Sequence, residues 1–145
     1  MTQEQINLLK EFGFQIGEDD HRGRTPIYSE KIPDLLSLEM LILTMTFQDE
    51  INYWDADWYS PTDPGGYVSA LRLDNERVAY MEGNHGWTSR WYIVTIKEMA
   101  EHMQKNWDKD CDRGKFLNRV WIEPNRYTTK EKIREKISKD SKLSF

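Results

Sequence analysis

The segment between residues 67 and 107 constrains the fold more than any other, because the spacing of its apolar residues changes part-way along. Two β-favouring runs, 67–73 and 77–81, are separated by Asp74, Asn75 and Glu76. Asp and Asn tolerate the positive φ angles of a tight hairpin turn. Side chains alternate between the two faces of a strand, and neither set in 67–73 is polar throughout. The segment therefore predicts an antiparallel hairpin with both faces partly covered.

A third strand and a helix are predicted directly after this hairpin. The run 91–94 is aromatic and β-branched, which indicates a central strand. Thr95 and Glu98 then have the spacing of a capping box, which marks a helix start. Beyond them one helical face is apolar, at Ile96, Met99, Ala100, Met103 and Trp107. This period predicts a helix over 96–107 that packs on the sheet.

The first half of the chain predicts a short helix, two short strands and one ambiguous segment. Thr2 and Gln5 form another capping box, and the apolar stripe after them ends at Gly13, a residue typical of helix ends. Strands are predicted at 14–16 and 25–30. Residues 34–54 have apolar residues at both helical and alternating spacing. We expect a helix there, because the run is longer than a usual strand.

The C-terminal third predicts one more strand and one more helix. Residues 116–122 are a strand candidate that Pro124 ends. Thr128 and Glu131 form a further capping box, but the helix after them has only a narrow apolar stripe. We expect this basic C-terminal end to pack weakly and to be mobile.

Together these segments predict a single α+β domain, with a mainly antiparallel sheet of about four strands packed with three to four helices. The 145 residues suffice for a hydrophobic core. The single cysteine, Cys111, excludes an internal disulfide and favours the reducing cytoplasm. No apolar run approaches the roughly 20 residues that cross a bilayer, and the N-terminus lacks the order of a signal peptide. We expect no membrane association.

The charge of the chain is unevenly distributed. The net charge is -5, but residues 32–71 contain seven Asp or Glu and no Lys or Arg. Residues 113–145 contain ten Lys or Arg and four Asp or Glu. In the predicted final helix the basic residues alternate with Glu131 and Glu135, a spacing typical of ion pairs on a helix surface. This pattern argues against nucleic-acid binding.

The acidic middle of the chain is also rich in aromatic residues. Tyrosine and tryptophan are frequent at protein interfaces, and clustered carboxylates attract basic partners. The candidate partner-binding residues are Asp49, Glu50, Tyr53, Asp55, Asp57, Trp58 and Tyr59. An alternative is that the aromatic residues belong to the core and the acids only solvate the chain. The pattern predicts a non-enzymatic inhibitor or binding protein for a basic partner protein, of an immunity or anti-defence type.

A second functional hypothesis uses the predicted loop 84–90. His85, Trp87 and Arg90 supply a hydrogen-bonding group, an aromatic platform and a cation, which suit a phosphate, nucleotide or small ligand. This arrangement predicts a ligand-binding domain or enzyme with a concave pocket. The simpler alternative is a hairpin connection whose tryptophan covers the core.

Signals for metal binding and nucleophilic catalysis are weak. Asp108, Asp110 and Asp112 alternate as calcium ligands do, but the glycine falls one place late and Arg119 replaces the bidentate glutamate. We interpret this segment as a solvated loop and expect no metal or cofactor. Asp110 and Asp112 would also raise the pKa of the Cys111 thiol, which disfavours a reactive thiolate.

The histidines are the remaining candidate ligands. Asp19, Asp20 and His21, joined by His85 or His102, would form a metal or acid-base site only if folding assembled them. His102 falls on the polar flank of its predicted helix. We interpret each histidine as a surface or hydrogen-bonded residue.

Overall fold

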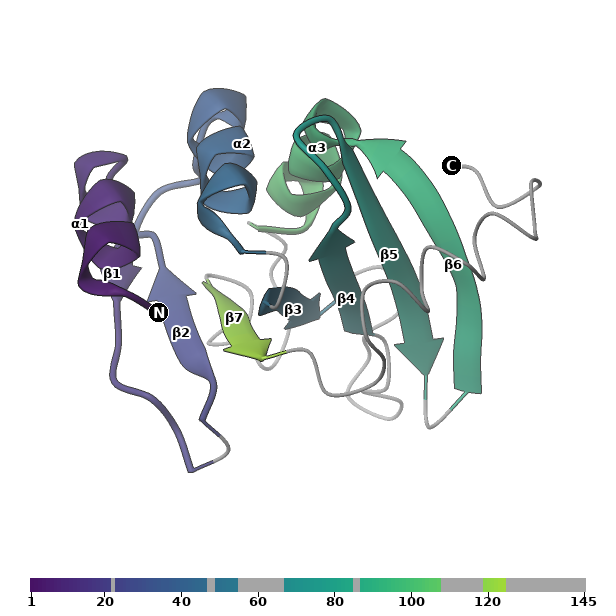
Figure 1. Ribbon diagram of the computed structural model, residues 1–145, viewed down its shortest axis with the longest axis horizontal. Helices are drawn as coiled ribbons and strands as arrows, with labels where there is room; N and C mark the ends of the chain where they lie inside the picture. Colours follow the sequence, from purple (N-terminus) through teal and green to yellow (C-terminus); the bar gives the residue numbers. More distant parts are fainter. Residues whose placement is uncertain (22, 47–48, 55–66, 85–86, 108–118, 125–145) are drawn as a thin grey trace.

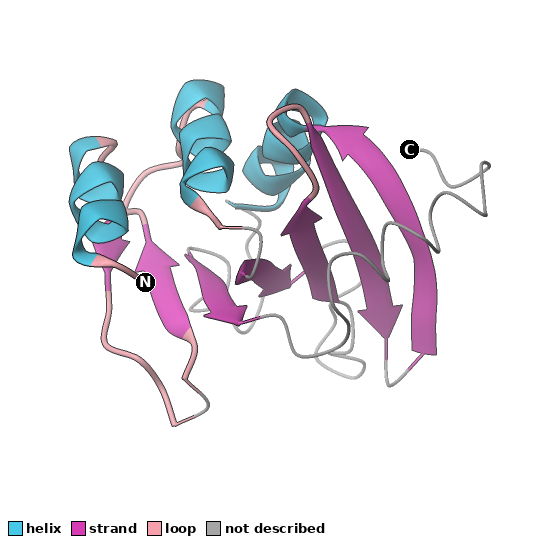
Figure 2. Ribbon diagram, viewed as in Figure 1, coloured by secondary structure: helices cyan, strands magenta, loops and turns pink. Residues whose placement is uncertain are grey.

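The structure is a computed structural model that describes residues 1–21, 23–46, 49–54, 67–84, 87–107 and 119–124. Within these ranges, three helices lie over one face of a seven-stranded sheet (Figure 1). Figure 2 shows the two layers, with the helices in cyan and the strands in magenta. The predicted α+β class is confirmed, although the sheet has more strands than the predicted four.

The N-terminal part begins as the sequence predicts. Helix α1 (Gln3–Glu11) starts at a capping box, in which Thr2 Oγ1 accepts from Gln5 N at 3.1 Å and Thr2 N donates to Gln5 Oε1 at 2.8 Å. The helix ends before Gly13, whose φ of +91° favours glycine. Two short strands follow, β1 (Gln15–Ile16) and β2 (Thr25–Tyr28).

The sheet has the order β1-β2-β7-β3-β4-β5-β6, and every neighbouring pair is antiparallel. The remaining strands are β3 (Asp49–Trp54), β4 (Tyr67–Arg72), β5 (Arg77–Asn84), β6 (Trp87–Thr95) and β7 (Arg119–Pro124). Strand β7, the last along the chain, pairs with both β2 and β3. It therefore joins the N-terminal strands to the β3–β6 meander in one sheet.

The main core lies between the helices and the sheet. Helix α3 (Ile96–Trp107) has the predicted bounds, and its predicted apolar face is buried. Its start is capped as predicted, with Thr95 Oγ1 accepting from Glu98 N at 3.0 Å. Helix α2 (Leu35–Thr44) contributes Leu38, Leu41 and Ile42, and α1 contributes Leu9. The sheet residues of this core are Ile27, Ile51, Tyr53, Val68, Ala70, Val78, Tyr80, Val94, Val120 and Ile122.

The opposite face of the sheet is also partly buried, as the mixed polarity of residues 67–73 predicted. Leu71, Leu73, Ala79 and Met81 form a second cluster there, and Ile93 packs against it. These residues alternate along β4 and β5 with the residues of the main core. Burial on both faces explains why neither set of side chains in 67–73 is polar throughout.

The predicted helix over 34–54 is wrong in its second half. Helix α2 ends at Thr44, and the chain forms strand β3 from Asp49. Met45 is already extended, with ψ of 140°. Asp49 Oδ2 then accepts hydrogen bonds from both N and Oγ1 of Thr46, at 2.9 Å each. These local bonds to a short polar side chain compete with helix continuation.

Two predictions about the sheet near β6 are also corrected. The run 91–94 was predicted as a central strand, but among the described residues β6 pairs only with β5 and lies at the edge of the sheet. Aromatic and β-branched residues indicate that the faces of a strand are buried, but they do not indicate whether the strand has one neighbour or two. The predicted loop 84–90 is also much shorter, since β5 continues to Asn84 and β6 begins at Trp87.

Candidate functional site

The first half of the predicted partner-binding run is an interior strand. Because β3 lies between β7 and β4, its side chains alternate between two covered faces. Glu50 is 1% exposed and Tyr53 is 4% exposed, so the structure buries two residues that we expected at the surface. Asp49 is half-buried and fixes the turn at Thr46. The other four candidates, Asp55, Asp57, Trp58 and Tyr59, lie outside the described residues.

A buried polar network occupies the sheet face opposite the helices. Asn52 Nδ2 donates to Glu50 Oε1 at 3.1 Å, and Ser69 Oγ donates to Asn52 Oδ1 at 2.5 Å. Across the sheet Asn52 is paired in register with Trp121, whose ring lies 5.2 Å from the Arg24 guanidinium carbon. Hydrogen bonding offsets the desolvation of these buried polar groups. The network therefore stabilises the junction of β3, β4 and β7.

A cluster of tyrosines and one histidine lies on the helix side of the sheet. Tyr53 Oη and His102 Nδ1 are 2.6 Å apart, and the His102 ring centroid lies 5.6 Å from that of Tyr80. The Tyr80 and Tyr92 rings are stacked at 5.3 Å. His102 is half-buried, whereas the sequence placed it on the polar flank of α3. It bonds to a tyrosine from β3, a contact that helical spacing alone does not show.

We expect Tyr53→Phe to lower the free energy of unfolding by about 1 kcal/mol, because it removes one hydrogen bond from a buried site. Urea unfolding of Tyr53→Phe, His102→Ala and the double variant would isolate the coupling between the two side chains. A coupling near zero would contradict a stabilising bond between them.

The structure describes only part of the other two predicted sites. His85 lies outside the described residues, and Trp87 and Arg90 belong to strand β6. Their role in ligand binding stays a prediction. Asp20 forms an ion pair with Arg24 at 2.8 Å, and Asp19 Oδ1 accepts from Thr25 Oγ1 at 2.6 Å, so both acids stabilise the turn before β2.

No group of three or more potential metal ligands occurs among the described residues. Asp108, Asp110, Cys111 and Asp112 lie outside them, as does the predicted final helix after Thr128.

Two described carboxylates with shifted pKa values serve local structure. Asp34 caps α2, and the hydrogen bond from Ser37 N to Asp34 Oδ1 at 2.7 Å lowers the pKa of Asp34. Partial burial raises the pKa of Asp74, but hydrogen bonds from Glu76 and Arg77 outweigh it and lower that pKa overall. Both carboxylates are therefore ionised at neutral pH, as caps of a helix and a hairpin turn.

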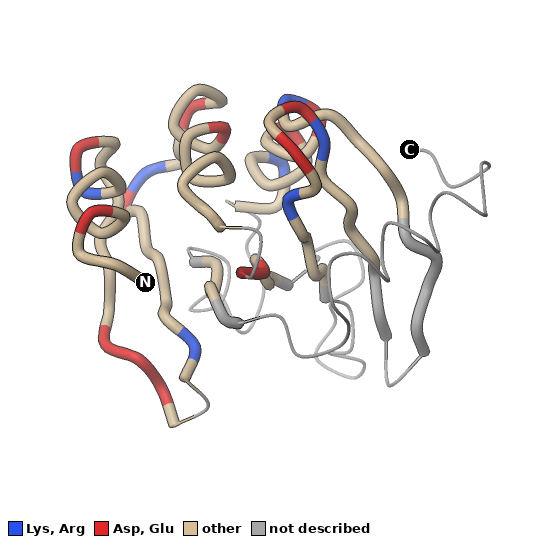
Figure 3. Tube along the Cα trace, in the orientation of Figure 1, with Lys and Arg blue, Asp and Glu red and all other residues tan. Residues whose placement is uncertain are grey.

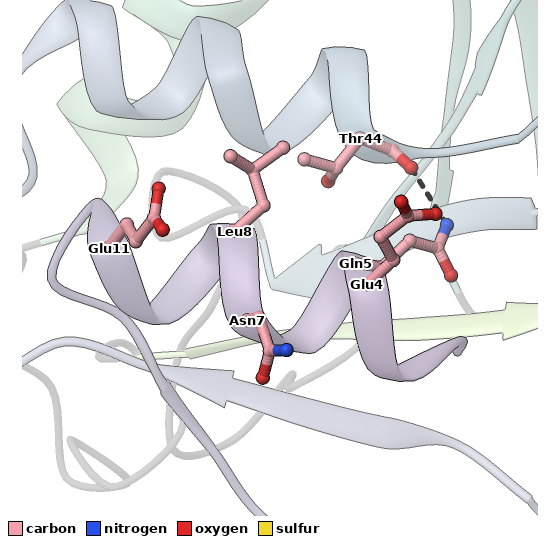
Figure 4. A pocket seen from close by; sticks show the side chains of 6 residues that line it. All are labelled: Glu4, Gln5, Asn7, Leu8, Glu11 and Thr44. Atoms are coloured by element: carbon pink, nitrogen blue, oxygen red, sulfur yellow. Dashed lines mark hydrogen bonds between the residues drawn. The ribbon is translucent and has the colours of Figure 1, made fainter.

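The surface has a hollow that the sequence did not predict. We call this hollow, which has a volume of about 440 Å³, the α1–α2 groove. The described residues that line it are Glu4, Gln5, Asn7, Leu8, Glu11 and Thr44. Figure 4 shows Leu8 pointing toward α2, with Glu4 and Glu11 on either side of it. Gln5 Nε2 donates to Thr44 O at 2.7 Å and ties the two helices together. The groove forms by helix packing, so no local motif signals it.

Comparison with known protein families, curated proteins and solved structures finds no match to this chain. None of the helices in the described ranges has both the length and the apolar character needed to cross a membrane.

Proposed function

We propose that this chain is a small, non-enzymatic, acidic binding or inhibitor protein of the cytoplasm that engages a basic partner protein. The observation that supports this most directly is the charge of the described surface, where nine Asp or Glu and five Lys or Arg side chains are exposed. Acidic residues occur on α1, on α2 and along the loop before β2 (Figure 3). A surface with this bias raises the rate at which a basic partner is captured.

The proposed contact surface includes the acidic-aromatic residues that follow β3 in the sequence. Asp55, Asp57, Trp58 and Tyr59 come directly after Trp54, the last residue of that strand. Glu50 and Tyr53 are left out of this surface because they are buried. Aromatic side chains carry much of the binding energy in protein interfaces, and acids around them select a basic partner. The mode resembles that of immunity or anti-defence inhibitors in composition only.

We expect replacement of both Trp58 and Tyr59 by Ala to weaken partner binding by about 100-fold or more, since it removes two interface aromatic residues. The partner would first be captured from source-cell lysate at low and high salt and identified by mass spectrometry. Its affinity for wild-type and variant protein would then be measured by titration calorimetry. The control is Leu36→Ala, which removes an apolar side chain that is 61% exposed on α2.

Circular dichroism separates a binding defect from a folding defect in this experiment. A folded double variant that binds like the wild type would contradict the proposed surface. If the double variant unfolds, Asp55→Asn with Asp57→Asn replaces it, because these changes remove charge with little change of size. Unchanged binding by that second variant at low salt would likewise count against the proposal.

A further inference from the structure

We propose that the α1–α2 groove binds an amphipathic helix of the partner that carries two basic residues seven positions apart. This inference rests on the proposed function and names a second contact surface for it. A helix that lies in a groove between two other helices is a common mode of peptide recognition. The occupant is identified here by the charges and the apolar residue that the groove presents.

The spacing along α1 sets the pattern that the partner helix needs. Glu4, Leu8 and Glu11 stand at positions i, i+4 and i+7, so they share one face of the helix. At a rise of 1.5 Å per residue, the two glutamates are about 10 Å apart along the axis. A partner helix with Lys or Arg at i and i+7 has the same separation. An apolar residue between those two bases would then face Leu8.

The charges of the groove favour a basic occupant. Glu4 and Glu11 are exposed, and neither forms an ion pair with another residue in the described ranges. Among the described residues, the lining of the groove includes no Lys or Arg, and Lys10, the basic residue in the last turn of α1, does not line it. A basic helix would therefore gain two ion pairs without displacing a described Lys or Arg side chain.

The groove is also held in shape before anything binds. The hydrogen bond from Gln5 Nε2 to Thr44 O connects α1 to the last residue of α2. Leu9 and Leu41, both 0% exposed, fix the two helices in the core below. A preformed groove orders fewer groups on binding, which favours affinity.

The probe for this proposal is a synthetic, Ala-rich helical peptide with two Lys residues seven positions apart and Leu three and four positions after the first Lys. Binding to the full chain would be followed by fluorescence anisotropy, and the contacted residues would be located by NMR shift changes. We expect Glu4→Gln with Glu11→Gln to weaken binding at least 10-fold. Glu76→Gln with Glu101→Gln removes the same charge from exposed sites elsewhere and should leave the affinity unchanged.

Three results would overturn the proposal. The first is equal weakening by both double variants, because that indicates a general charge effect. The second is equal binding of a peptide with the same composition but with its Lys residues on opposite faces. The third is shift changes that lie away from α1 and the end of α2.

The affinity of the captured partner for the variants distinguishes failure of the groove proposal from failure of the proposed function. If its affinity falls with the Trp58 and Tyr59 variant but not with Glu4→Gln and Glu11→Gln, the groove proposal is wrong and the proposed function stands. If no basic protein is captured, the proposed function fails, and the assignment of the groove to a partner helix fails with it even where the peptide binds there. Loss of partner binding with Glu4→Gln and Glu11→Gln supports both.

Discussion

Leu41→Ala is expected to lower the free energy of unfolding by about 3 kcal/mol, within the range of about 2–5 kcal/mol for leucine truncation in a core. Leu41 is 0% exposed on α2, which lies between α1 and α3 over the sheet (Figure 1). The loss combines the transfer energy of the missing carbons with the cost of the cavity they leave. Urea unfolding followed by circular dichroism measures the change.

The matched control is Leu36→Ala, the same substitution at a position five residues earlier on the same helix. Leu36 is 61% exposed, so we expect a change within about 0.5 kcal/mol. The pair tests which face of α2 is buried. Helical spacing over 34–54 places Leu36 on an apolar stripe with Leu43, whereas the structure buries Leu38, Leu41 and Ile42. Equal effects of the two substitutions would contradict the observed orientation.

Arg72→Ala is expected to lower the free energy of unfolding by about 3 kcal/mol, because its side chain donates to two carbonyl groups at the end of α2 and to one in its own hairpin. Arg72 Nη1 donates to Leu43 O at 3.0 Å and to Met45 O at 2.9 Å, at the end of α2. Arg72 Nε donates to Asp74 O at 3.1 Å, and Nη2 donates to Asn75 Oδ1. Hydrogen bonds from a charged donor are stronger than neutral ones. Without this side chain the carbonyl groups at the helix end lose their donor.

Arg77→Ala is the control for Arg72→Ala, since both residues belong to the same hairpin. Arg77 pairs with Asp74 at 2.9 Å, but its side chain is 58% exposed. Exposed ion pairs contribute at most about 1 kcal/mol, so we expect a small effect. Denaturant midpoints and slopes of the two variants would be compared. A loss from Arg77→Ala as large as that from Arg72→Ala would indicate a general charge effect and not a specific link to α2.

The elements that the sequence predicted well are those whose signals are local. The capping boxes at Thr2 and Thr95 both form, and the apolar face of α3 is buried as its spacing indicates. The hairpin over 67–81 was likewise predictable, because its two strands are joined by a short turn and are close in sequence. Such contacts involve residues a few positions apart, so the sequence pattern contains them.

The candidate site was predicted less well, because burial depends on strands that are distant in sequence. Asp49 to Trp54 has the composition of an exposed acidic-aromatic surface. The structure instead places this segment between β4 and β7, which buries Glu50 and Tyr53 on opposite faces. Nothing local to β3 indicates that a strand more than 60 residues later pairs beside it.

The α+β class, the hairpin, the bounds of α3 and the acidic bias could be predicted from the order of the residues, since they follow from hydrophobic period, helix capping and composition. The end of α2, the order of the strands in the sheet and the acidic groove beside α1 depend on how whole elements pack. The hydrogen bonds from Arg72 to Leu43 O and from Gln5 to Thr44 O show why these features could not be predicted. Each bond joins residues 29 or 39 positions apart, and only the packing of whole elements brings such pairs together.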